Sequence, residues 1–563
     1  MTTFSSYKRE EIMNNIQETS LDLLVIGGGI TGSGIALDAV TRGLNTAVIE
    51  MQDFAAGTSS RSTKLVHGGL RYLKQFEVGL VAEVGKERAI VYENGPHVTT
   101  PEWMLLPFHK GGTFGPFTTN IGLRMYDFLA GVKKKERRKM LSPEEALQTE
   151  PLIKKENLRG AGYYVEYKTD DARLTIEVMK KAVQKGALAL NHTKVTELLT
   201  NDAGKLIGVI VEDQITGKTS EIFAKKIINA GGPWVDQIRE LDEEITGKRL
   251  QLTKGVHLVF SKEVFPLRQA IYFDTPDGRM IFAIPRAGKT YVGTTDTPYQ
   301  GDIANPTITE EDREYILDAI RYMFPTIDLK QDDIESSWSG LRPLIAAEGK
   351  KPGEISRKEE IFISDSGLIS MAGGKLTGYR KMAEEAVDTV VKQFKEEGIL
   401  YDKSSTKDLP ISGGEVGGSY GFSRFKKRMI EQGMIHNLSE DEASNLISTY
   451  GANVEKIYEY IEAAQDDMAL SKVMYAQLKY AIEEEMAYKP TDFFIRRTGK
   501  LFFDIASVVQ YKDAVLDYMK DELNWTDTQT KDYTEEMNRL IDEAQHAETK
   551  KIINLKKAFT NLV

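Results

Sequence analysis

The stretch from Leu21 to Leu37 limits the fold of this chain more than any other part of its sequence. Leu23–Ile26 is an uninterrupted apolar run, long enough for a buried strand and too short for a helix. A glycine-rich turn with the spacing G-x-G-x-x-G follows, and Ile35–Val40 continues in a helical pattern. A strand, a glycine turn and a helix in this order predict a βαβ unit that binds a dinucleotide.

Each glycine of the turn has a separate physical role. Gly27 permits the tight turn, Gly29 lets the backbone approach a pyrophosphate, and Gly32 lets the helix pack closely on the strand. Glu50 ends the next predicted strand, 18 residues after Gly32, where an acid binds the ribose hydroxyls of such a ligand. The acid argues against a 2′-phosphorylated cofactor, but it does not separate FAD from NAD.

The composition excludes several classes of function. A length of 563 residues allows two to four domains, and a net charge of −11 argues against nucleic-acid binding. The absence of cysteine excludes disulfides, thiolate metal sites and cysteine-linked flavin. Residues 1–20 are polar and mixed in charge, and no stretch is long and apolar enough to span a membrane. We therefore expect a cytoplasmic protein whose membrane contact, if it has one, is peripheral.

A loop dense in hydroxyl groups follows the βαβ unit. Hydroxyl residues favour surface loops that cap helices, which is the simpler interpretation. Their concentration beside a phosphate-binding turn instead indicates contact with the cofactor. The residues concerned are Thr58, Ser59, Ser60, Ser62, Thr63 and the cationic Lys64.

The stretch from Ser59 to Leu73, S-S-R-S-T-K-L-V-H-G-G-L-R-Y-L, resembles the signature of FAD-dependent glycerol-3-phosphate dehydrogenases. These enzymes belong to the D-amino-acid-oxidase-like flavoenzymes. The resemblance continues in order along the chain at Asn229–Trp234, Lys254–His257, Gly293–Thr297, Gly340–Leu344, Gly373–Arg380 and Asp492–Thr498. It implies that the dinucleotide is FAD, bound without a covalent link.

The fold class implied is α/β, with a Rossmann-type FAD-binding domain, an inserted antiparallel-sheet substrate domain and a C-terminal helical domain. The FAD-binding domain is expected to be discontinuous, because the substrate segments interrupt it. The expected ranges are 1–100, 170–245 and 340–400 for FAD binding, 101–169 and 246–339 for the substrate domain, and 405–563 for the helices. Leu501–Met519 is one of the expected helices, and Arg496 and Arg497 just before it are either family-specific or simple surface charges.

The resemblance also assigns residues to the cofactor. In such folds Val195 holds the adenine by backbone contacts, and the turn at Gly231 and Trp234 lies on the flavin side. A second glycine turn opens a helix, whose N–H groups should face the flavin pyrimidine and stabilise negative charge there. Its cofactor residues are Gly373, Gly374, Leu376 and Thr377.

The implied reaction is oxidation of sn-glycerol 3-phosphate to dihydroxyacetone phosphate, with a hydride passing from C2 to flavin N5. His257 is the candidate base, since its ordinary pKa is near neutral. Arg342 should orient the reacting oxygen, and Lys375 should stabilise the reduced flavin. Arginine forks suit phosphate, and the residues expected to bind it are Arg71, Tyr72 and Arg357.

The electron acceptor is the least constrained point. A membrane quinone and oxygen are both open, and the short link Glu348–Ile355 favours the quinone-linked dehydrogenase over the oxidase. The apolar stretch and basic cluster over Ile121–Lys139 suit an anionic membrane surface, although charge runs are usually just solvated. An amine or amino-acid oxidase and a non-catalytic flavin-binding protein are the rival functions. The sequence does not set the oligomeric state, and a homodimer stays open.

Overall fold

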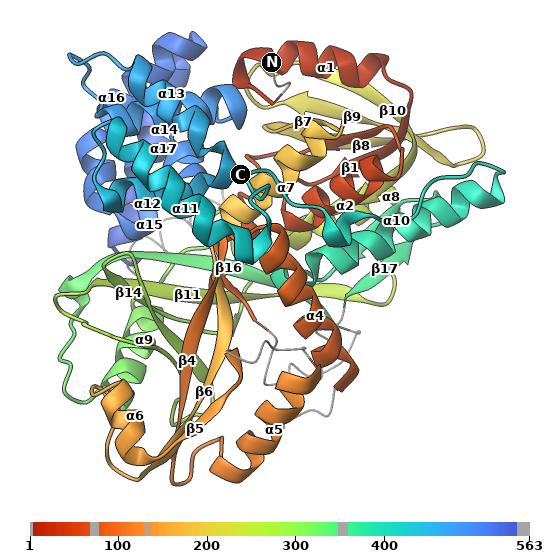
Figure 1. The fold of residues 1–563 in the computed structure, drawn as a ribbon. Coiled ribbons are helices and arrows are strands. Elements are labelled where there is room, and N and C mark those ends of the chain that lie inside the picture. The colour runs from red at the N-terminus through yellow and green to blue at the C-terminus, as the bar shows by residue number, and fades with distance from the viewer. Residues whose placement is uncertain (1–3, 68–77, 130–135, 347–358, 549–563) are drawn as a thin grey trace.

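The computed structural model of the protein describes residues 4–67, 78–129, 136–346 and 359–548. Two sheets stand one above the other in Figure 1, and helices of the last third of the chain pack beside both. The helices are α1 (Arg9–Glu18), α2 (Ile30–Thr41), α4 (Val78–Asn94), α5 (Pro116–Leu129), α6 (Pro143–Thr149), α7 (Asp171–Gln184), α8 (Val235–Asp242), α9 (Glu310–Met323), α10 (Tyr379–Glu396), α11 (Gly418–Ile435), α12 (Glu440–Tyr450), α13 (Val454–Ala463), α14 (Lys472–Glu484), α15 (Lys500–Phe503), α16 (Ile505–Leu523) and α17 (Asp527–Gln545).

The first sheet contains the predicted βαβ unit. Its strand order is β17-β18-β10-β1-β2-β7, with all neighbours parallel except β17 and β18, and β8 and β9 extend it from β10. Every residue of β1 is buried, as expected for a parallel strand covered on both faces. The strands are β1 (Leu21–Ile26), β2 (Thr46–Ile49), β7 (Leu188–Leu190), β8 (Thr193–Thr200), β9 (Leu206–Asp213), β10 (Thr219–Asn229), β17 (Glu360–Ile363) and β18 (Ile369–Ala372).

The second sheet is mixed rather than wholly antiparallel. The strands β4 and β12 run parallel, while the other pairs in the described chain are antiparallel. These two strands come from distant segments of the chain, so no hairpin forces them to be antiparallel. The strands are β3 (Leu65–Val66), β4 (Thr99–His109), β5 (Lys139–Leu141), β6 (Leu158–Thr169), β11 (Arg249–Ser261), β12 (Ala270–Asp274), β13 (Met280–Arg286), β14 (Lys289–Gly293), β15 (Thr297–Pro298) and β16 (Ile334–Ala346).

The predicted C-terminal helices are present, with one difference. The expected helix Leu501–Met519 is divided into α15 and α16. The division falls at Asp504, whose side chain accepts a hydrogen bond from Ser507 N and so caps α16. The α15 segment brings Phe502 against Trp338 of β16, with ring centroids 5.1 Å apart, so the helical region shares a hydrophobic core with the second sheet.

A buried ionic network ties the helical region to the first sheet. Asp53 is fully buried and accepts hydrogen bonds from Arg496 Nε at 2.5 Å and from Arg497 Nη1 at 2.6 Å. Nearby, His192 Nε2 lies 3.0 Å from Asp492 Oδ2. The interpretation of Arg496 and Arg497 as surface charges is therefore wrong, because both guanidinium groups are paired inside the protein.

Replacing Asp53 should test how strongly this network holds the two regions together. We expect Asp53→Asn to lower the free energy of unfolding by about 3–5 kcal/mol, since it removes the anion that two buried arginines share. The exposed pair of Arg539 and Glu543 serves as the control, and Arg539→Gln should lower it by at most about 1 kcal/mol. Denaturant unfolding measures both. Equal losses from the two variants would contradict a stabilising role for the buried network.

Candidate active site

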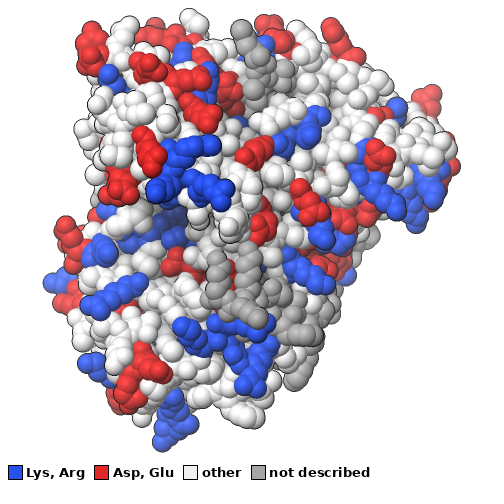
Figure 2. Space-filling model, in the orientation of Figure 1, with Lys and Arg blue, Asp and Glu red and all other residues white. Residues whose placement is uncertain are grey.

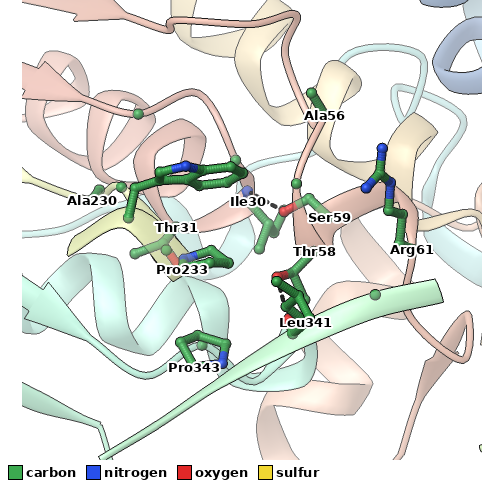
Figure 3. A pocket seen from close by; sticks show the side chains of 18 of the residues that line it. Ile30, Thr31, Ala56, Thr58, Ser59, Arg61, Ala230, Pro233, Leu341 and Pro343 are labelled. Atoms are coloured by element: carbon green, nitrogen blue, oxygen red, sulfur yellow. Dashed lines mark hydrogen bonds between the residues drawn. The ribbon is translucent and has the colours of Figure 1, made fainter. Parts of the chain in front are cut away.

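One cavity of about 620 Å³ begins at the carboxyl end of β1 and reaches the second sheet. It is lined by the glycine turn, by the hydroxyl loop and by strand ends of both sheets (Figure 3). Most of the predicted cofactor residues line it: Gly27, Gly29, Glu50, Thr58, Ser59, Ser62, Thr63, Val195, Gly231, Trp234, Gly373, Gly374, Leu376 and Thr377. The predicted catalytic residues His257, Arg342 and Lys375 line the same cavity. Sequence segments up to 351 residues apart therefore face one space, counting from Ile26 to Thr377.

The glycine turn has the geometry that its sequence predicts. Gly27 has φ +112°, and a Cβ there would lie 2.6 Å from Ala230 O. A Cβ on Gly32 would lie 1.8 Å from Gly27 O, so only glycine allows α2 to approach β1 this closely. Gly32 itself does not line the cavity, which agrees with its packing role. The N-terminus of α2, with its N–H groups and positive dipole end, is thereby held at the cavity wall.

Glu50 follows β2 at the edge of the cavity. Its carboxylate accepts hydrogen bonds from Gly28 N at 2.7 Å and from Gln52 N at 2.8 Å. Burial raises the pKa of Glu50, and these two N–H groups act in the opposite direction by stabilising the charged form. The two bonds fix the orientation of the carboxylate beside the glycine turn.

The hydroxyl loop is largely bound to the protein itself. Thr58 Oγ1 donates to Leu341 O at 2.7 Å, and Ser62 Oγ donates to Asp171 Oδ2 at 2.7 Å. Ser59 Oγ accepts from Ile30 N at 2.9 Å, which leaves its own hydrogen to donate into the cavity. Figure 3 shows Ser59 pointing to Ile30 and Thr58 pointing to Leu341. These hydroxyls therefore shape the wall of the cavity as well as facing it.

Besides Gly32, two of the predicted cofactor residues do not reach the cavity. Ser60 and Lys64 are buried behind it, 1% and 3% exposed. Lys64 Nζ is 2.5 Å from Asp171 Oδ1 and 2.9 Å from Ser60 O. The expectation that the Lys64 ammonium meets the cofactor is thus corrected, because a buried carboxylate already neutralises it. Asp171 is the first residue of α7, far away in sequence, so the pattern around Lys64 did not reveal it.

His257 and Arg342 come from adjacent strands of the second sheet. His257 on β11 is almost fully buried, and its Nε2 lies 3.0 Å from Thr63 Oγ1. Burial holds the pKa of His257 well below its ordinary value, with the cations of Arg342 and Lys64 adding to the effect. Arg342 on β16 donates to Thr294 Oγ1 at 2.9 Å and to the backbone oxygen of the next residue at 3.1 Å. The cavity therefore combines a neutral imidazole with a fixed guanidinium.

The structure adds residues that the sequence did not single out. His67, quoted in the signature without a role, also lines the cavity, and burial lowers its pKa. Arg61, which the hydroxyl pattern passed over, lines it too and donates to Ala304 O at 3.0 Å. The position of a charged residue inside this hydroxyl-rich loop is the signal that would have identified Arg61. The predicted phosphate-binding residues Arg71, Tyr72 and Arg357 lie outside the described residues.

The cavity fits an extended dinucleotide. One glycine turn and a helix N-terminus offer N–H groups near Glu50, and a second turn at Gly373 and Gly374, with φ of +102° and +156°, lines the same cavity. Lys375 follows this turn, before the short helical segment that leads into α10. The fold and the cavity together define a Rossmann-type dinucleotide-binding protein with a second sheet over the reactive end.

Comparison with known proteins agrees with this class. A family described as FAD dependent oxidoreductase matches residues 22–380, and the C-terminal domain of alpha-glycerophosphate oxidase matches residues 404–530. The chain belongs to this family of FAD-dependent oxidoreductases. It is 61% identical to an aerobic glycerol-3-phosphate dehydrogenase of Bacillus subtilis (strain 168), over 96% of this chain and 98% of that one. A protein of the same name from Staphylococcus haemolyticus (strain JCSC1435) is 59% identical over the same shares.

A solved structure extends the likeness to three dimensions. The glycerol-3-phosphate dehydrogenase from Bacillus halodurans complexed with FAD has a TM-score of 0.85 and 48% identity, covering 97% of this chain and 99% of that one. The predictions of the fold class, of the family and of FAD as cofactor are confirmed. Along the described ranges, we find no helix with both the length and the apolar character needed to cross a bilayer.

The buried His257 should make stability depend on pH. Because its pKa is lowered on folding, the unfolded chain binds a proton that the folded chain does not when the pH falls below about 6.5. The free energy of unfolding should then decrease by about 1.4 kcal/mol per pH unit on account of this group. We expect His257→Gln to reduce that slope between pH 7 and pH 5 in denaturant unfolding. An unchanged slope would contradict the buried neutral imidazole.

Proposed function

We propose that the protein oxidises sn-glycerol 3-phosphate to dihydroxyacetone phosphate and passes the electrons to a membrane quinone. The observation that carries the proposal is that one cavity is lined both by the glycine turn and by His257, Arg342 and Lys375. The names of the relatives, aerobic glycerol-3-phosphate dehydrogenases, support the same substrate. FAD, when bound, supplies the acceptor for a hydride and its two electrons.

Three residues of the cavity have separate roles in the proposed reaction. Neutral His257 takes up the proton of the C2 hydroxyl, which a protonated imidazole is unable to do. Arg342 orients the oxygen and stabilises the charge that develops on it, since its guanidinium is already held by Thr294. Lys375 and the N–H groups of the second glycine turn stabilise negative charge on the reduced cofactor. These roles, and phosphate binding by Arg71, Tyr72 and Arg357, stay predictions.

The substrate and the acceptor are tested in one series of measurements. Under anaerobic conditions, glycerol 3-phosphate should bleach the flavin absorbance, whereas glycerol and glycine should leave it unchanged. Glycine is included because an amine oxidase of the same fold would respond to it. The reduced protein should then transfer its electrons to a short-chain quinone faster than to oxygen. Stoichiometric hydrogen peroxide in air, with slow quinone reduction, would make it an oxidase instead.

The proposal includes contact of α5 with an anionic membrane surface. The outward face of α5 carries Phe117, Ile121 and Met125, which are 77%, 47% and 38% exposed and four residues apart. Leu123, on the opposite face, is fully buried. Figure 2 shows lysine and arginine side chains gathered on the lower part of the molecule, over the region of α5. An apolar stripe flanked by cations suits an interfacial helix.

Vesicle binding tests the membrane contact. We expect Ile121→Glu to weaken co-sedimentation with anionic lipid vesicles about tenfold, because it places a negative charge in the exposed apolar face that would enter the membrane. Val509 on α16 is 50% exposed and gives the control, since Val509→Glu makes the same kind of change elsewhere. Binding should also fall as salt is added. Equal binding by the two variants would show that α5 is not the contact. A homodimer stays a prediction.

A further inference from the structure

Thr63 and His257 both line the cavity, and the Thr63 hydroxyl faces the imidazole of His257. Thr63 lines the cavity, and its Oγ1 is 3.0 Å from His257 Nε2. The other ring nitrogen, Nδ1, is closed to the cavity and has no hydrogen-bond partner in the described part of the chain. A proton from a ligand in the cavity therefore reaches this imidazole at Nε2, where the Thr63 hydroxyl already lies.

The imidazole ring is fixed in this orientation. It stacks on the Trp338 ring with centroids 4.7 Å apart and planes 11° from parallel. Its edge packs on Gly293, where an added Cβ would lie 2.3 Å from His257 Cδ2. Stacking on one side and close packing on the other hold the ring in the orientation in which Nε2 faces Thr63.

Asp171 fixes the position of Thr63 by binding the residues on both sides of it. One oxygen of that buried carboxylate accepts from Ser62 N at 3.0 Å and Ser62 Oγ at 2.7 Å, and the other accepts from Lys64 Nζ at 2.5 Å. Lys64 has φ +56°, an unfavourable region for a lysine, which this ion pair maintains. Tyr291 also donates its hydroxyl to Thr63 O at 3.1 Å. Both neighbours of Thr63 and its own carbonyl are thus anchored.

From this geometry, and resting on the proposed function, we infer that Thr63 relays the proton of the substrate hydroxyl to His257. The C2 hydroxyl gives its proton to Thr63 Oγ1 while Thr63 gives its own hydroxyl proton to His257 Nε2. The hydrogen on C2 leaves with the electron pair of the C2–H bond as a hydride, which the bound cofactor would accept, and the C2–O bond becomes a carbonyl. The threonine ends as it began, and His257 holds the proton.

The relay requires one tautomer of the neutral imidazole. With the hydrogen on Nδ1, Nε2 accepts from Thr63 and the relay is open. With the hydrogen on Nε2, the imidazole donates to Thr63 and has no place for a further proton at that nitrogen. The tautomer of His257 therefore decides between a relay and a purely structural contact.

Nitrogen NMR of the protein labelled at histidine reads this tautomer without any turnover. The chain has seven histidines, and the signal of His257 is the one lost in His257→Gln. We expect a pyridine-type Nε2 and a pyrrole-type Nδ1, and a change in both on Thr63→Val. A pyrrole-type Nε2 would overturn the relay.

Rapid-mixing kinetics of flavin reduction give the second test. Thr63→Val should slow the reduction by glycerol 3-phosphate about 100-fold with little change in substrate affinity, and Thr63→Ser should restore most of the rate. Thr290 on β14 provides the control, because its buried hydroxyl donates only to Phe265 O, at 2.8 Å. We therefore expect glycerol 3-phosphate to reduce the flavin of the Thr290→Val variant as fast as that of the unaltered protein.

The outcomes separate the relay from the function on which it rests. If Thr63→Val is reduced as fast as the unaltered protein, the relay is wrong and the function stands. If glycerol 3-phosphate fails to reduce the flavin of the unaltered protein, the proposed function is wrong. The tautomer measurement then still decides whether Thr63 donates to His257.

Discussion

The approach of α2 to β1 at Gly32 is the contact on which the cofactor side of this molecule depends. A Cβ at this position would lie 1.8 Å from Gly27 O, so the helix axis and the strand end are brought together only because both residues are glycine. The N-terminus of α2 thereby meets the carboxyl end of β1, where Glu50 and the turn at Gly231 also arrive. In an open parallel sheet this edge is where ligands bind, and the cavity lies there.

The sequence alone predicted those parts of the site whose geometry depends on residues close together in the chain. The turn at Gly27, the acid after β2 and the second turn at Gly373 all depend on residues close together in the chain, and each lines the cavity. Lys64 is turned away from the cavity by its ion pair with Asp171, which is 107 residues away in the sequence and is brought close only by folding. Arg496 and Arg497 were ambiguous for the same reason, since their partner Asp53 lies in another part of the chain. A local sequence pattern does not show which charged side chains will be buried and paired by distant segments of the chain.

In the hydroxyl loop, the sequence predicted which residues lie at the cavity but not all that their side chains do there. The density of Ser and Thr predicted contact with the cofactor, and Thr58, Ser59, Ser62 and Thr63 do face the cavity. Three of these hydroxyls are nevertheless bonded to Leu341, Ile30 and Asp171. A hydroxyl that both donates and accepts is able to brace a loop and meet a ligand together, so its type alone does not divide the two tasks.

The buried pairing of Asp53 with Arg496 and Arg497 has a consequence for how such proteins change over evolutionary time. The carboxylate lies in the segment 22–380 and the arginines in the segment 404–530. Recombination that exchanged one segment for an unrelated domain would strand unpaired charges in the interior of both products. Exchange of either segment is therefore expected to leave a stable protein only where the carboxylate and the two arginines are kept or replaced together.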